Sequence, residues 1–105
     1  MQKRMSLILG IVCLFFGIAC QRKIATIQVG DGPWALVWNS TNNKVYCAHN
    51  WDASVTVIDG ATNQVITTIQ VGDEPCAFAW NSIRNRVYLA NQESSSISVI
   101  RDDRH

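Results

Sequence analysis

The chain has 105 residues, four cysteines and a formal net charge of +1 at pH 7. This length leaves room for one small domain at most. The basic residues form no patch of the kind that nucleic-acid binding requires, so we expect no nucleic-acid partner.

Residues 1–20 have the pattern of an export signal rather than of a folded segment. Lys3 and Arg4 form a basic start, and the uncharged apolar run SLILGIVCLFFGIA follows. A membrane-spanning helix needs about 20 apolar residues, more than this run offers. The pattern therefore favours a cleaved signal peptide. An uncleaved anchor is an alternative, because Arg22 and Lys23 place positive charge just beyond the run. A plain signal without lipid is the other alternative to a lipoprotein.

The end of this segment, FGIAC at 16–20, resembles a bacterial lipobox, although Gly17 stands where leucine is usual. The resemblance implies that Cys20 is lipidated after cleavage. Two or more acyl chains hold a protein stably at a membrane. We therefore expect an exported, lipid-anchored protein of the cell envelope, on the periplasmic face or the cell surface, with the membrane as a partner.

From residue 24 onward the sequence repeats itself with a period of 42. Shifting the chain by this period aligns 24–63 with 66–105 without a gap, and 19 of the 40 pairs are identical. Periods of this size are typical of propellers and solenoids. The sequence thus divides into a signal, 1–20, and a mature part, 21–105, with repeats at 24–65 and 66–105.

Each repeat predicts short β-strands and no helix. KVYCAHN at 44–50 alternates between two faces, and SVTVID at 54–59 is rich in β-branched residues. The segments VGDGP, NSTNN, NWDA and DGATN are turn signals. In the first turn of each repeat we expect Gly30 and Gly72 to adopt positive φ. Four short strands per repeat are the content of one propeller blade.

The segments YCAH at 46–49 and YLAN at 88–91 resemble the motif of the YVTN family of β-propeller repeats, and the flanking VGDGP and SVTVID agree with it. The resemblance covers residues 24–105. It implies an outer strand at 24–29, a complete blade at 34–71 and three inner strands of another blade at 76–100. The expected fold is all-β, with two four-stranded antiparallel propeller blades forming a partial propeller or half-ring that needs oligomerisation.

Two blades cannot close a ring, because a blade is stable only between neighbours and about three repeats are needed. Open blades expose strand edges and apolar faces, which favours association. Either several copies assemble into a ring of six to eight blades, or the chain is a truncated member of the family. The segment RDDRH at 101–105 departs from the repeat, and we favour truncation.

The sequence offers little for catalysis or metal binding. It contains no nucleophile elbow and no HExxH motif. Cys47, His49 and Asp52 provide three donors without a fourth, which is a weak metal signal. We expect no catalytic residue, no metal and no cofactor. Export would permit a disulfide between Cys47 and Cys76, but we expect two small, buried, unpaired side chains.

A binding face is the more useful hypothesis. In a blade of this type, the loop before the first strand and the loop between the second and third strands open on the same face. These loops are 30–33 with 50–53, and 72–75 with 92–95.

The possible ligand or partner face consists of Asp31, His49, Trp51 and Asp52. The indole of Trp51 could stack on a sugar or on a partner chain. Alternatively, Trp51 covers a neighbouring blade, and His49 simply ends its strand as Asn91 does in the second repeat.

The resulting hypothesis is a non-enzymatic binding or scaffold protein of the cell envelope, built from YVTN repeats. One alternative is a self-assembling, carbohydrate-binding propeller. Another is an accessory remnant of a periplasmic redox or catabolic enzyme system. A fold by itself assigns no ligand, and the sequence names none.

Overall fold

The computed structural model describes residues 21–101. The expected signal peptide, lipobox and lipidation at Cys20 lie outside these residues. The described chain is all-β, with two antiparallel sheets and no helix. The strands are β1 (Pro33–Asn39), β2 (Lys44–His49), β3 (Ser54–Asp59), β4 (Val65–Gln70), β5 (Pro75–Asn81), β6 (Arg86–Asn91) and β7 (Ser96–Arg101).

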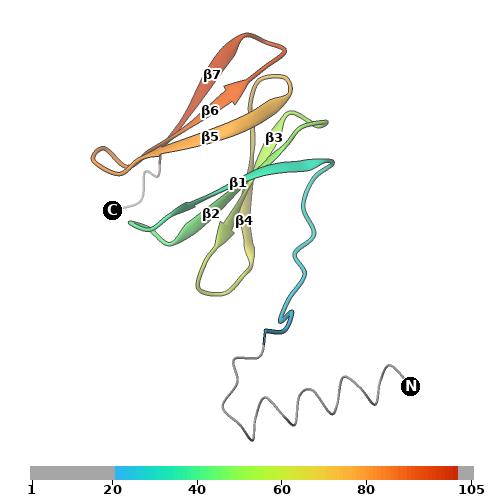
Figure 1. Ribbon diagram of the computed structural model, residues 1–105, viewed down its shortest axis with the longest axis vertical. Helices are drawn as coiled ribbons and strands as arrows, with labels where there is room; N and C mark the ends of the chain where they lie inside the picture. Colours follow the sequence, from blue (N-terminus) through green and yellow to red (C-terminus); the bar gives the residue numbers. More distant parts are fainter. Residues whose placement is uncertain (1–20, 102–105) are drawn as a thin grey trace, which may run out of the picture.

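Strands that follow one another in sequence are neighbours within each sheet. The first sheet has the order β1-β2-β3-β4 and the second has the order β5-β6-β7. Figure 1 shows the two sheets stacked, with β5 lying next to β1. Short turns join all antiparallel neighbours, which is the simplest way to connect them.

The three strands expected at 76–100 are confirmed, so the second sheet has three strands and the expectation of four strands in each sheet holds for the first sheet alone. The outer strand expected at 24–29 is wrong, because this segment is not a strand in the structure. Residues 24–29 lead into β1 of the first sheet, whereas a fourth strand of the second sheet would lie next to β7. The segment therefore does not complete the second sheet within this chain.

The two repeats have matching backbone features in the segments that form β1–β3 and β5–β7. Non-glycine residues with positive φ recur 42 positions apart, at Asn43 and Asn85 and at Ala53 and Ser95. The same register irregularity follows the first residue of β1 and of β5. The repeated sequence therefore encodes the same turns and the same strand pairing twice.

Gly30 and Gly72 are conserved between the repeats for a different reason than expected. Gly32 is the one glycine with positive φ in residues 21–101, so the expectation for Gly30 and Gly72 is wrong. A Cβ on Gly30 would overlap the His49 ring and the Asp52 carboxylate. These glycines allow the close approach of a side chain from the β2–β3 or β6–β7 loop.

The hydrophobic core lies between the two sheets. Alternate residues of each strand point into it, as the period of two requires. The buried members are Tyr46, Ala48, Val55 and Val57 from the first sheet and Val87, Leu89 and Ile100 from the second. Burial of each large apolar side chain contributes about 1.5–3 kcal/mol, so this contact holds the sheets together.

Two hydrogen bonds also cross between the sheets. The Asn39 side-chain amide donates to Oδ1 of Asn85 at 2.6 Å. The Asn50 side-chain amide donates to the carbonyl of Pro75 at 3.4 Å. These polar contacts lie at two different loops of the first sheet, and they fix how it sits on the second.

The two cysteines of the described chain are unpaired. Cys47 is buried and Cys76 is half-buried, and burial raises the pKa of the Cys47 thiol. Within residues 21–101, the structure contains no helix long and apolar enough to cross a membrane.

Candidate functional site

The loops expected to share one end of each sheet do lie together. The backbone N–H of Asn50 donates to the carbonyl of Gly32 at 2.8 Å. In the second repeat, the N–H of Gln92 donates to the carbonyl of Glu74 at 3.0 Å. The loop before the first strand is therefore bonded to the loop between the second and third strands in both sheets.

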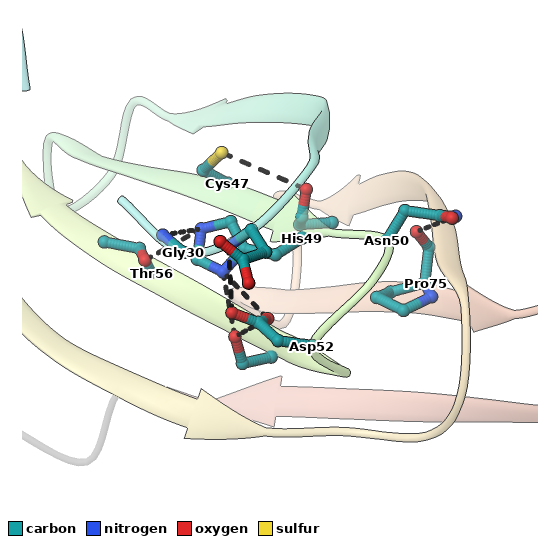
Figure 2. A network of polar contacts seen from close by, with 10 residues as sticks. Gly30, Cys47, His49, Asn50, Asp52, Thr56 and Pro75 are labelled. Carbon is teal, nitrogen blue, oxygen red and sulfur yellow. Dashed lines mark hydrogen bonds and ion pairs between the residues drawn. The ribbon is translucent and has the colours of Figure 1, made fainter. Parts of the chain in front are cut away.

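His49 ends β2 at this site and is completely buried. Nδ1 lies 2.8 Å from the Ser54 hydroxyl and Nε2 lies 2.9 Å from the Thr56 hydroxyl. The N–H of Gly30 donates to Nε2 at 3.2 Å, as Figure 2 shows. With Nε2 as the acceptor of this bond, Nδ1 is the ring nitrogen that faces the Ser54 hydroxyl.

Asp52 completes the network beside His49. The Ser54 hydroxyl donates to Oδ1 at 2.5 Å, and the N–H of Asp31 donates to Oδ2 at 2.9 Å. The hydrogen bond from Ser54 lowers the pKa of the Asp52 carboxyl, with smaller contributions from the N–H of Asp31 and from His49. The side chain remains 37% exposed.

The sequence-predicted residues thus have different roles. Asp31, His49 and Asp52 belong to one network that ties the loop before β1 to the β2–β3 loop. His49 has no exposed surface, and both ring nitrogens are already hydrogen-bonded. The network therefore fixes the shape of the loop that carries Trp51, and a ligand can reach Trp51 but not the His49 ring.

The second repeat builds a weaker version of the same network. Asn91 replaces His49 and donates to Ser98 at 2.9 Å and to Ser96 at 3.3 Å. Ser94 replaces Asp52 and accepts the N–H of Asp73 at 3.2 Å. The buried Oδ1 of Asn91 has no hydrogen-bond partner among the described residues. A polar atom buried in this way costs stability, so the loops of the second sheet are less firmly held.

Trp51 forms one wall of a shallow depression between the two sheets. The depression has a volume of about 590 Å³. Its lining consists of Asn50, Trp51, Ala53, Asp73, Glu74 and Glu93. Trp51 is 81% exposed, although its ring lies against the backbone at Gly32. A Cβ on Gly32 would come within 3.3 Å of the indole.

The part of the lining that comes from the second sheet forms an acidic wall, because it carries Asp73, Glu74 and Glu93. Glu74 adopts a φ of 51°, at the position that Gly32 occupies with a φ of 69° in the first repeat. A left-handed conformation costs a non-glycine residue about 1–2 kcal/mol. Ala53 also lines the depression and has a φ of 53°. Two residues of the lining therefore have a left-handed backbone, and such strain is common at functional sites.

The sequence reasoning missed these three carboxylates. The signal was the replacement of Gly32 by Glu74 and of Trp51 by Glu93 between otherwise similar loops. These replacements indicate an acidic surface only once the structure shows that loops of both repeats line one depression. No group of three or more residues suited to a metal ion occurs within residues 21–101.

No family model matches the sequence, and no curated protein matches it either.

Proposed function

We propose that the chain is a non-enzymatic binding or scaffold protein of the cell envelope, built from YVTN-type β-propeller blades and anchored by lipid on Cys20. The observation that supports it most is the relation between the sheets. They share one strand register and one set of turns, and one face of the first packs on the opposite face of the second. Successive propeller blades stack in this manner.

The depression beside Trp51 is the binding surface of this proposal. It lies where loops of two adjacent sheets meet, and ligand sites commonly form at such junctions. Its aromatic wall offers a flat apolar face, and its acidic wall offers hydrogen-bond acceptors. This chemistry suits a polar ligand that carries several donors and an apolar face.

Lipidation and location are tested together by producing the full chain in a bacterial host. We expect membrane fractionation and a mass increase of a lipidated cysteine on Cys20. The Cys20→Ser variant is the matched control and should lose both. A wild-type chain that remains unlipidated in the cytoplasm would contradict the proposed location.

A carbohydrate ligand is the second candidate, and the exposed Trp51 beside carboxylates favours it. Soluble envelope glycan fragments are titrated into the full chain by calorimetry. We expect the Trp51→Ala variant to lose binding and the Trp51→Phe variant to keep part of it, because the phenyl ring retains a stacking face. Glycan binding that is equal in wild type and Trp51→Ala would exclude this surface.

A further inference from the structure

We propose that residues 23–28 of one copy of this chain add to β7 of a second copy as its fourth strand, so that copies associate head to tail. The inference rests on the proposed function only in treating the two sheets as blades.

The donated segment has the sequence of a strand that already exists in the structure. KIATIQ at 23–28 corresponds to VITTIQ at 65–70, which is β4. β4 leads directly into β5, as residues 23–28 lead into β1. In Figure 1 the segment before β1 runs away from both sheets, and Ile24 is 88% exposed. A strand-forming sequence thus lies without a sheet in the described chain.

The accepting edge is equally well defined. β4 pairs with β3, whereas β7, the counterpart of β3, is an edge of the second sheet. Edge strands offer unpaired backbone groups as a template for another chain. In the first sheet Val55 lies opposite Ile69, and Thr56 lies opposite Thr68.

The 42-residue period converts this register into a prediction for two copies. Val55 and Ile69 correspond to Ile97 on β7 and Ile27 of the neighbouring copy. Thr56 and Thr68 correspond to Ser98 on β7 and Thr26 of the neighbouring copy. Adding a strand in this register is the β-augmentation mode of recognition.

The open face of the second sheet is the counterpart of a face that is buried in the first. Val55 is fully buried and Val57 is 4% exposed, whereas Ile97 and Val99 are 66% and 56% exposed. The backbone positions are the same, so the difference is the absence of a covering sheet. The second sheet thus carries an apolar face shaped like one that is covered elsewhere in this chain.

The open face of the first sheet supplies the cover. Leu36 and Trp38 on β1 are 69% and 58% exposed. Their counterparts, Phe78 and Trp80, pack against the core between the sheets. A neighbouring copy that places Leu36 and Trp38 on Ile97 and its neighbours therefore repeats a contact that the chain already makes internally. Exposed apolar surface of this kind marks interaction sites.

The polar contacts between the sheets have counterparts as well. Asn39 donates to Asn85 within the chain. The corresponding donor is Asn81, whose side-chain amide has no acceptor in residues 21–101, and the corresponding acceptor is Asn43 of the neighbour. Asn43 lies at the same turn position as Asn85 and also has a positive φ. Its Oδ1 accepts the indole N–H of Trp38 at 3.0 Å, and the second lone pair of this oxygen is the acceptor for the amide of Asn81.

This contact joins two different surfaces, so it is heterologous and repeats from copy to copy. Each copy brings two sheets. Propellers contain about 4–8 blades, so a closed ring holds two to four copies. A closed ring is favoured because it covers the exposed apolar face of every sheet.

Cysteine crosslinking between two differently tagged full chains, co-produced and purified in detergent, tests the register. One chain carries Ile27→Cys and the other carries Ile97→Cys. Mild oxidation should yield a disulfide-linked product with both tags, because directly opposite cross-strand residues are close enough for a disulfide. The control pair, Thr26→Cys with Ile97→Cys, should not crosslink, because neighbouring residues of a strand point to opposite faces.

Absence of the crosslink in protein that keeps its β circular dichroism signal would overturn the inference, as would equal crosslinking of both pairs. If a strand from a different protein pairs with β7, the crosslink will be absent. Both results leave the proposed binding function standing. Conversely, crosslinking in a chain that is not found at the envelope supports the assembly and counts against the proposed location.

Discussion

The side-chain amide of Asn39 on β1 donates a 2.6 Å hydrogen bond to Oδ1 of Asn85 in the β5–β6 loop. In the first repeat, the equivalent oxygen of Asn43 accepts the indole N–H of Trp38 at 3.0 Å. Trp80, the counterpart of Trp38, has a buried indole N–H without a partner among the described residues. The acceptor that serves a tryptophan in one repeat therefore joins the two sheets in the other.

Replacing Asn39 by alanine should lower the free energy of unfolding by about 1–3 kcal/mol, because it leaves polar partners unsatisfied. Asn39 is 1% exposed, and it also accepts the N–H of Thr41. Urea unfolding followed by circular dichroism measures the change. We expect the loss at every protein concentration.

Asn81→Ala is the matched control, since Asn81 also accepts turn N–H groups. Its amide lacks an acceptor within the described chain, so its effect should be smaller and should fade on dilution. An equal loss for both variants in dilute protein would mean that the bond between the sheets contributes nothing specific.

The His49 network gives a second prediction. Removing the ring with His49→Ala should cost about 2–4 kcal/mol, since it creates a cavity and leaves the N–H of Gly30 and the Thr56 hydroxyl without partners. His49→Asn should cost much less, because Asn91 fills the same position in the second repeat. Thermal unfolding of the two variants distinguishes them, and equal losses would argue against the hydrogen bonds.

The lowered pKa of Asp52 predicts how stability depends on pH. The folded pKa lies below the ordinary value of 3.8, so the carboxylate stabilises the fold fully above that value. The contribution is lost as the pH falls through the lower, folded pKa. Denaturation midpoints measured from pH 6 down to acid should therefore fall less steeply in Asp52→Ser than in wild type.

Serine is the matched replacement for Asp52, because Ser94 occupies the equivalent position. The two proteins should converge in stability at the lowest pH, where the carboxylate is protonated. An unchanged difference across the whole range would mean that the charge of Asp52 has no role.

Relief of backbone strain at Glu74 should stabilise the protein. Its φ of 51° favours glycine, and the gain for Glu74→Gly is about 0.5–1 kcal/mol after the flexibility of glycine in the unfolded chain is subtracted. Chemical denaturation measures it. Asp73→Gly is the control, since Asp73 lies next to Glu74 without a positive φ, and it should show no gain.

The sequence was sufficient to predict the strands and turns of each repeat. Alternating and β-branched segments such as 44–49 and 54–59 carry local signals that do not depend on the rest of the chain. The pairing of 24–29 was not predictable in this way. A strand forms only where the edge of a sheet is available for pairing. The edge that residues 24–29 match is β7, which belongs to the second sheet.

The site was predicted only in part for the same reason. The Asp31–Asp52 contact follows from the loops that the repeat brings together. The role of Gly30 depends on a side chain 19 residues away, and the acidic wall depends on how one sheet stacks on the other. Neither relation has a local signal, because both are tertiary contacts.

Native mass spectrometry of the full chain released from detergent distinguishes head-to-tail association through β7 and the open sheet faces from a monomer. We expect a discrete assembly of about two to four copies, as a ring of 4–8 blades requires. We also expect Asn81→Ala and Leu36→Asp to shift this species toward the monomer. A folded monomer at all concentrations would overturn head-to-tail association.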